Sequence, residues 1–249
     1  MKFCKIEYND KAHWGSVKEN KVYIIDKKPW QKWKETGEII SKEDGRLLCP
    51  VDPKNIIGIG KNYKSNFKSG ETFPSEPFLF LKGLGALAAS GDLIKIPSYS
   101  KKVFIEGELV IIIGKRCKNI QPGDSMNYIF GYTCSNDITA VDMLGKSKKW
   151  VEAKSADDFL PIGPVINTEI KSDASLKTTL DGEIVQKTTI DQLVFGIAEL
   201  VSYCSKIMTL NPGDIITSGS PAGKQVCNGS TVCISIEGIG TLKNEFVGE

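Results

Sequence analysis

The sequence predicts a β-rich α+β fold, because it holds many short apolar segments bounded by glycine, proline or polar residues and few segments with helical periodicity. Asp181-Gly182 separates two further strand-like segments and is typical of a hairpin turn. Because the strands do not alternate with helices, the pattern disfavours a parallel βαβ architecture. The clearest strand-like segments are residues 55–59, 78–81, 103–113, 129–135, 215–218 and 232–236.

The chain divides into two predicted units, a small N-terminal domain of residues 1–50 and a larger domain of residues 54–249. The boundary falls at Pro50 and Pro53, since two prolines so close together disfavour both a helix and a central strand. In the first unit we expect strands over residues 2–8 and 22–25 and a short helix from Pro29 to about Gly37. In the second, apolar residues at helical spacing predict a helix over about residues 190–207 and a shorter one over 124–129.

The composition is ordinary for a soluble globular protein, with 41% hydrophobic and 25% charged residues and a net charge of +2. The densest basic cluster, residues 146–149, is too short for a nucleic-acid-binding surface and is predicted to be a solvated loop. The N-terminus lacks an apolar signal core and the longest apolar run, residues 109–113, is far too short to cross a bilayer. Seven cysteines without a CxxC pair indicate a reducing compartment, so we expect a cytoplasmic protein without nucleic-acid or membrane partners.

Two glutamates, Glu106 and Glu108, interrupt an apolar strand-like segment. Alternate residues of a strand lie on the same face, so the two carboxylates are expected side by side, roughly 7 Å apart along the backbone. Burying them unpaired would be costly, and a bound cation resolves both their repulsion and their lost hydration. The alternative is that this end of the strand reaches solvent and that both glutamates are hydrated.

Asp137 favours the metal interpretation because it ends a second strand-like segment and can face the glutamate pair. Three carboxylates without histidine or cysteine select a hard cation such as Mg²⁺, with Mn²⁺ or Ca²⁺ as alternatives. The single histidine, His13, cannot build a zinc site.

A series of short motifs runs from about residue 55 to the C-terminus. In their order and spacing these motifs resemble those of the fumarylacetoacetate hydrolase superfamily. They are Gly58-Ile59-Gly60-Lys61-Asn62-Tyr63, Phe80-Leu81-Lys82, Glu106-Gly107-Glu108, Gly131-Tyr132-Thr133 with Asn136-Asp137, Lys154-Ser155, Pro161-Ile162-Gly163-Pro164, Asp181-Gly182-Glu183 with Gln186, and Pro212-Gly213-Asp214 with Ser218-Gly219-Ser220-Pro221-Ala222-Gly223.

The resemblance implies a mixed β-sheet roll or barrel with a few packed helices, assembled as a homodimer. It also implies an enzyme that acts on a small 2-oxo acid or β-diketo acid, because the family includes hydrolases, decarboxylases and tautomerases of such acids. A Mg²⁺ ion would be held by the two glutamates and the aspartate named above, and would stabilise an enolate as a Lewis acid. Lys154 matches a family lysine near the metal and is the candidate catalytic residue. Ser220, Tyr63 and Asn66 are the candidate substrate-binding residues, and residues 64–76 match a lid.

The chain also departs from its family. Hydrolases of the family activate water with a histidine and a glutamate, but Asn66 and Ser69 stand at those positions and neither takes a proton near neutral pH. An arginine and a glutamine that grip the substrate are replaced by Val141 and Leu144, which suggests a substrate less anionic or more apolar at one end than a dicarboxylate. Three readings remain open: a decarboxylase or tautomerase, which we favour; a C–C hydrolase with another base, such as Lys154, Asp157 or metal-bound hydroxide; and a non-catalytic binding module.

Overall fold

The computed structural model of the protein describes residues 1–145 and 149–249, so most of the predicted basic loop at 146–149 lies outside the described residues. The described chain is built mainly from strands, which confirms the predicted β-rich α+β fold. None of its helices combines the length and the apolar character that a membrane span requires.

Most strands belong to one mixed, twelve-stranded sheet with the order β4-β3-β2-β1-β14-β12-β11-β17-β6-β7, in which β5 also pairs with β1 and β8 with β14. Its strands are β1 (Lys2–Tyr8), β2 (Lys11–Lys18), β3 (Lys21–Ile25), β4 (Glu35–Ser41), β5 (Arg46–Leu48), β6 (Ile56–Gly60), β7 (Phe78–Leu81), β8 (Leu87–Ala89), β11 (Gly107–Ile113), β12 (Ile129–Asn136), β14 (Leu160–Asn167) and β17 (Ile215–Thr217).

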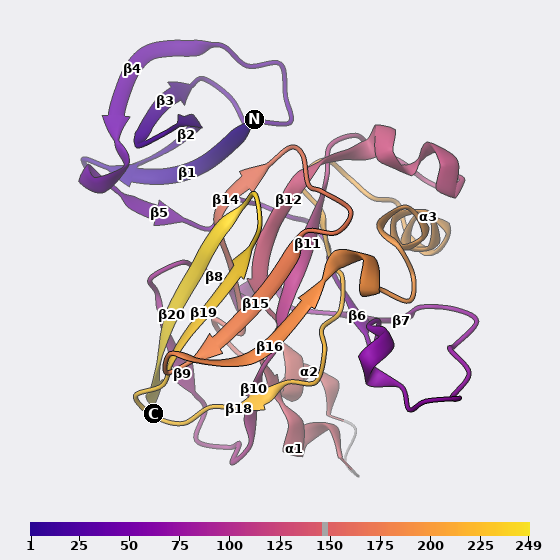
Figure 1. Ribbon diagram of the computed structural model, residues 1–249. Coiled ribbons are helices and arrows are strands. Elements are labelled where there is room, and N and C mark those ends of the chain that lie inside the picture. The colour runs from indigo at the N-terminus through magenta and orange to yellow at the C-terminus, as the bar shows by residue number, and fades with distance from the viewer. Residues whose placement is uncertain (146–148) are drawn as a thin grey trace.

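Two smaller sheets complete the fold, with the orders β13-β10-β18 and β16-β15-β19-β20-β9. Their strands are β9 (Leu93–Ile96), β10 (Val103–Ile105), β13 (Thr139–Ala140), β15 (Ser175–Leu180), β16 (Glu183–Thr189), β18 (Lys224–Gln225), β19 (Thr231–Ile236) and β20 (Gly240–Gly248). The helices are α1 (Val141–Leu144), α2 (Trp150–Lys154) and α3 (Ile197–Ile207), besides short 3₁₀ turns. Figure 1 shows the long strands in the middle of the molecule, α3 beside them and α1 and α2 together at one end.

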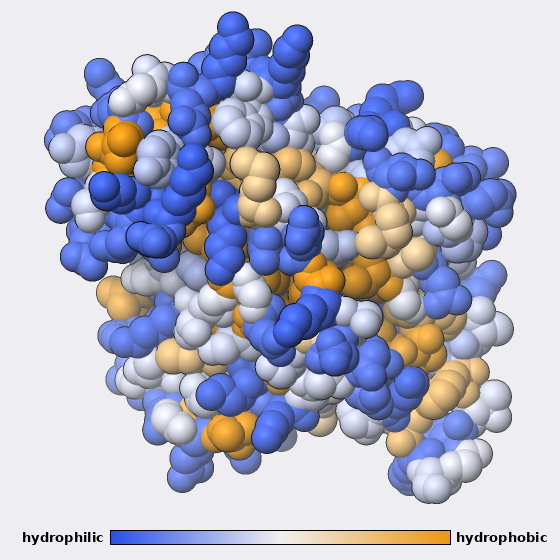
Figure 2. All heavy atoms as spheres, turned by 45° about the horizontal axis from the view of Figure 1, so that its top comes forward, coloured by the Kyte–Doolittle hydropathy of each residue, from blue (hydrophilic) through white to orange (hydrophobic). Residues whose placement is uncertain are grey.

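The core lies around β11, in which every residue is buried, and its neighbour β12. The face shown in Figure 2 is mostly hydrophilic, and its hydrophobic residues gather in a band across the middle and one side. In Figure 1 most of the N-terminal strands lie to one side of the other strands, and β1 joins them to the large sheet by pairing with β14 at Lys2 and Phe3. The rings of Phe3 and Trp30 pack on Phe130, so apolar contacts also join the N-terminal strands to the larger part.

The predicted helix from Pro29 to about Gly37 is wrong, because this segment is a turn that leads into β4. The carboxylate of Asp26 accepts a hydrogen bond from the backbone of Lys34 at 2.8 Å, and Glu35 pairs with Ile25 of β3. The rings of Trp30 and Trp33 in this segment pack on Phe130 and Phe3 instead of forming a helical face.

The helix predicted over residues 190–207 begins only at Ile197, after a separate 3₁₀ turn at Ile190–Gln192. Asn62 interrupts it, because its backbone oxygen accepts from the N–H of Val194 and its side-chain oxygen accepts from that of Phe195. The shorter helix predicted at 124–129 is a 3₁₀ helix over Pro122–Tyr128. Tertiary contacts therefore override helical periodicity at both places.

Candidate active site

Three carboxylates meet where two central strands end. Glu106 lies between β10 and β11, Glu108 is the second residue of β11, and Asp137 follows β12. The backbone N–H of Asp137 donates to the carbonyl of Glu106 at 2.8 Å, and this bond places the aspartate opposite the glutamates. One oxygen from each carboxylate lies within 4.8 Å of the others. The structure thus brings together the three residues predicted to bind a metal, although the predicted continuous strand is broken at Glu106.

Two lysine ammonium groups contact this triad of carboxylates. Lys154 lies 2.6 Å from Asp137 Oδ2 and 3.2 Å from Glu106 Oε2. Lys82, to which the sequence assigned no role, donates to Asp137 Oδ1 at 2.6 Å and to the carbonyls of Ile138 and Phe159 at 3.1 and 2.8 Å. Burial lowers the pKa of Lys82 to about 8 although the charge of Asp137 opposes this shift, so at neutral pH the charged form, with three N–H donors for its three acceptors, still prevails. Both oxygens of Asp137 are therefore paired with a cation.

Burial and mutual repulsion set the acidity of the triad. Burial, together with the charges of Asp137 and Glu106, raises the pKa of Glu108 well above its usual range. Burial would also raise the pKa of Asp137, but the ammonium groups of Lys154 and Lys82 outweigh it and lower that pKa. Burial works against the charge of Lys154, yet its two carboxylate partners raise its pKa, so it stays protonated.

The triad has the donor chemistry of a hard divalent cation. Only oxygen ligands converge, and three carboxylates against two ammonium groups leave one uncompensated negative charge. Glu108 is held by the backbone N–H of Gly219 at 2.9 Å and Glu106 by the hydroxyl of Thr139 at 3.0 Å. Such second contacts orient metal ligands before the ion binds. The residues present therefore fit a Mg²⁺- or Mn²⁺-type ion.

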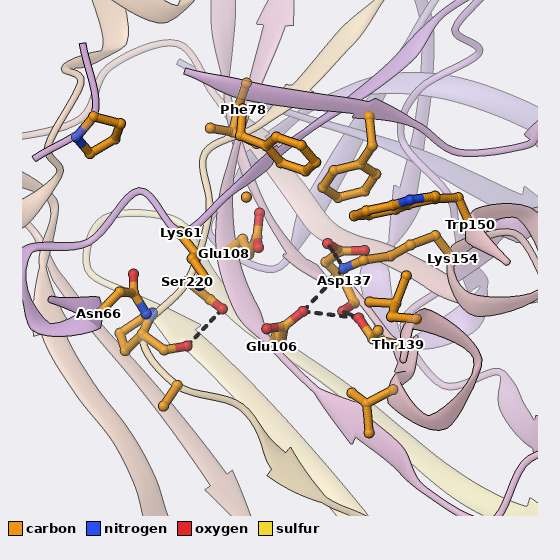
Figure 3. A pocket seen from close by; sticks show the side chains of 18 of the residues that line it. Lys61, Asn66, Phe78, Glu106, Glu108, Asp137, Thr139, Trp150, Lys154 and Ser220 are labelled. Atoms are coloured by element: carbon orange, nitrogen blue, oxygen red, sulfur yellow. Dashed lines mark hydrogen bonds and ion pairs between the residues drawn. The ribbon is translucent and has the colours of Figure 1, made fainter. Parts of the chain in front are cut away.

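The triad lines a cavity of about 660 Å³, within the usual size range of small-molecule sites. Figure 3 shows the carboxylates between a polar end, formed by Ser220 and Asn66, and Lys154 on the other side. Ser220 donates to the carbonyl of Pro221, and the side-chain oxygen of Asn66 accepts from the backbone of Tyr63. The predicted lid, residues 64–76, supplies Asn66, Phe67 and Pro74 to the lining. Its closure stays a prediction.

Tyr63, a candidate substrate-binding residue, lies outside the residues that line the cavity. Its side chain is fully buried, and its hydroxyl has no hydrogen-bond partner in the described part of the chain. A backbone bridge pairs Tyr63 with Leu193 instead. Its predicted contact with substrate has no counterpart in this arrangement, in contrast to Ser220 and Asn66.

The other end of the cavity is an aromatic wall, defined here as Phe78, Phe80 and Trp150. Phe78 and Phe80 lie on the same face of β7, since alternate strand residues do, and Trp150 is the first residue of α2. The ring centroid of Trp150 lies 5.5 Å from that of Phe78 and 5.9 Å from that of Phe80. Val141 and Leu144 of α1 also line the cavity. The sequence marked these two positions, but it gave no sign of the wall.

Gly58 and Gly60 make room for the aromatic wall. They pair with Phe80 and Phe78 across β6 and β7. A Cβ atom at Gly58 would lie 2.2 Å from the Phe80 ring, and one at Gly60 would lie 2.8 Å from Phe78. The two glycines therefore serve the packing of rings rather than the binding of a nucleotide phosphate.

Comparisons with known proteins identify the family of the chain. The family model for the C-terminal domain of fumarylacetoacetate (FAA) hydrolase matches residues 55–247, and an Rv2993c-like N-terminal model matches residues 1–50. Oxaloacetate tautomerase YisK of Bacillus subtilis is 36% identical over 213 residues, which cover 79% of this chain and 71% of that protein.

Solved structures show the same fold over the whole chain. The 5-carboxymethyl-2-hydroxymuconate delta-isomerase from Mycobacterium smegmatis has a TM-score of 0.95 and 34% identity, with both chains covered completely. The maleylpyruvate hydrolase from Sphingobium sp. SYK-6, solved with manganese(II) and pyruvate, has a TM-score of 0.82 and 25% identity, covering 100% of this chain and 99% of that chain. The chain belongs to the fumarylacetoacetate hydrolase superfamily and is an enzyme of that superfamily.

Proposed function

We propose that this protein is a metal-dependent tautomerase that interconverts the keto and enol forms of a 2-oxo acid. The observation that carries the proposal is the triad of Glu106, Glu108 and Asp137 in a cavity that keeps a lysine ammonium beside it. The conversion breaks one C–H bond at C3 and forms one O–H bond at the 2-oxo oxygen, so no atom is gained or lost. A divalent ion bound at the triad would supply Lewis-acid stabilisation of negative charge on that oxygen.

The chain's own residues supply positioning and charge. Ser220 and the amide of Asn66 lie where they can hold a substrate carboxylate by hydrogen bonds. The ammonium of Lys154 is fixed by two carboxylates and can donate a hydrogen bond to the oxygen on which charge develops. Its raised pKa favours this role as a donor over the role of a general base.

The absence of a water-activating pair favours tautomerisation over hydrolysis. Asn66 lies in the cavity lining at the family's histidine position, while Ser69, at the glutamate position, is exposed and outside the lining. Asp157, an alternative base for hydrolysis, is also exposed and outside it. Tautomerisation needs no activated water, so it does not depend on the missing pair. The tautomerase named among the relatives supports the same direction, whereas the neighbour solved with manganese and pyruvate is a hydrolase and supports only the binding of a divalent metal.

Metal titration tests whether the triad binds a divalent metal, as the proposal requires. Calorimetry of the wild type is expected to show binding of Mg²⁺ or Mn²⁺ that Glu106→Ala reduces at least tenfold, because one of three ligands is lost. Glu183→Ala removes an exposed glutamate of β16 and serves as the matched control. Equal affinity in all three proteins would remove the metal from the proposal.

Incubation of the metal-loaded protein with 2-oxo and β-diketo acids in D₂O tests the proposed tautomerase activity. Deuterium uptake at C3 without cleavage is the expected result. Release of CO₂ would make the protein a decarboxylase, and cleavage of a C–C bond by water would make it a hydrolase. Metal binding without any turnover across the panel would indicate a binding module.

A further inference from the structure

The cavity has two chemically different ends, and this difference bears on which substrate it takes. We propose that the site selects 2-oxo acids with an apolar substituent on C3, above all an aryl group, over 2-oxo dicarboxylates. The inference rests on the proposed function, since it concerns the same site. It reaches beyond that function because the tautomerase named among the relatives acts on a dicarboxylate, oxaloacetate.

The aromatic wall offers an incoming ring a surface that residues 1–145 and 149–249 leave partly uncovered. Phe78 is 53% exposed and Trp150 is 40% exposed, although large apolar side chains usually lie in the core. Trp150 stacks on Phe80 with an angle of 30° between the ring planes. An aryl group placed against these rings would cover apolar surface and gain further aromatic contact.

The position of the triad sets the direction in which a substrate extends. The carboxylates lie between the polar end, at Ser220 and Asn66, and the aromatic wall (Figure 3). Lys154 lies between the triad and the aromatic wall. Its ammonium contacts Asp137 at 2.6 Å and lies 4.6 Å from the centroid of the Phe80 ring. With the substrate carboxylate at the polar end and the 2-oxo group at the triad, the C3 substituent extends towards the aromatic wall.

A second carboxylate at that position would meet no free counter-charge among the lining residues that the structure describes. The described residues of the lining include two cations, Lys61 and Lys154. Lys154 is already bonded to two carboxylates, and Figure 3 places Lys61 beside Ser220 at the polar end. Val141 and Leu144 of α1 also line the cavity, and α1 contacts α2, which begins with Trp150; neither side chain gives a carboxylate a charge or a hydrogen bond. Loss of hydration without a partner is unfavourable for an anion.

A substrate panel in D₂O tests the proposal with the metal-loaded, full-length protein. Phenylpyruvate, pyruvate and oxaloacetate present an aryl group, no substituent and a carboxylate on C3, and proton NMR follows deuterium uptake above the uncatalysed rate. We expect kcat/KM for phenylpyruvate to exceed both other values at least tenfold. Highest turnover of oxaloacetate would overturn the inference and leave the proposed function standing, whereas no exchange with any of the three acids would overturn both.

Variants test whether the aromatic wall causes the expected selectivity for phenylpyruvate. Trp150→Ala is expected to lower the ratio of kcat/KM for phenylpyruvate to that for pyruvate about tenfold, mainly through KM. Val141→Arg places a cation at the apolar end and is expected to raise the ratio for oxaloacetate over phenylpyruvate at least tenfold. Ile184→Ala removes an exposed apolar side chain outside the lining and is the control that changes neither ratio. Unchanged ratios in both cavity variants, each with a wild-type melting temperature, would refute the role of the wall. If Trp150→Ala does not fold, Trp150→Leu keeps an apolar side chain there and carries the same expectation.

Discussion

Replacement of Lys82 by methionine tests whether the triad depends on a buried cation. The ammonium is fully buried, lies 2.6 Å from Asp137 Oδ1 and donates to two backbone carbonyls. Removal of one partner from a buried ion pair costs roughly 3–5 kcal/mol, because the remaining charge loses its compensation. For a chain of this length about 1 kcal/mol corresponds to roughly 2–4 °C, so we expect the melting temperature of metal-free Lys82→Met to fall by roughly 6–20 °C.

Differential scanning calorimetry in a chelating buffer measures this change, and Lys171→Met is the matched control. Lys171 forms an ion pair of similar length, 2.8 Å to Glu237, but its side chain is 74% exposed. Exposed pairs of this kind add little to stability, so the control should melt like the wild type. Added Mg²⁺ should raise the melting temperature of Lys82→Met more than that of the wild type, because the variant triad has one more uncompensated negative charge. Equal melting of both variants, or a weaker metal response in Lys82→Met, would refute the reasoning.

Three further predictions concern a buried carboxylate, a glycine beside the aromatic wall and the cysteines. Asp214→Asn should lower the free energy of unfolding by about 2–3 kcal/mol in a denaturant titration, because the buried carboxylate accepts from the backbone of residues 54, 55 and 211. Gly58→Ala should reduce kcat/KM at least tenfold in the deuterium exchange assay, since its methyl group displaces the ring of Phe80. In native protein at pH 8, thiol labelling followed by mass spectrometry should modify the exposed Cys227 first, whereas burial raises the pKa of Cys134 to about 12 and removes its reactive thiolate.

Local sequence pattern indicated the carboxylates that line the candidate site. The alternation of Glu106 and Glu108 within an apolar segment, and an aspartate at the end of another, identified the three carboxylates that the structure brings together. The break at Glu106 was not predictable, because it depends on hydrogen bonds from a different strand: Asn136 Oδ1 accepts from the backbone N–H of Glu106. The binding of a metal by the three carboxylates stays a prediction, as do the homodimer and the cytoplasmic location.

The residues that the sequence did not reveal are those whose role depends on distant segments. Lys82 belongs to a family motif but follows an exposed leucine, and nothing near it in the sequence shows that its side chain ends on Asp137, 55 residues further along the chain. The aromatic wall joins β7 to α2, which begins 72 positions after Phe78. Periodicity reports which face of an element is apolar, but it does not report which two elements meet.

Neutralising Glu108 should have the opposite effect on the stability of the metal-free protein to removing the charge of Lys82. Its carboxylate is buried beside two others, and its raised pKa means that the folded state binds the proton more tightly than the unfolded state. The wild type therefore loses stability as the pH rises above the ordinary glutamate value of roughly 4.3. Glu108→Gln keeps the shape and the acceptor for the N–H of Gly219 but removes the charge.

We expect metal-free Glu108→Gln to be more stable than the wild type at pH 7, by about 0.5–2 kcal/mol, as is common when a functional site is neutralised. The gain should shrink as the pH is lowered towards 4, where the wild-type carboxyl group is itself protonated. Melting curves across this pH range, with and without Mg²⁺, measure both effects, and the variant should lose the metal-induced rise. A variant less stable than the wild type at pH 7 would mean that Lys82 and Lys154 already compensate all three carboxylates. The triad would then have no excess negative charge to attract a cation, and the argument for a metal would have to rest on ligand geometry alone.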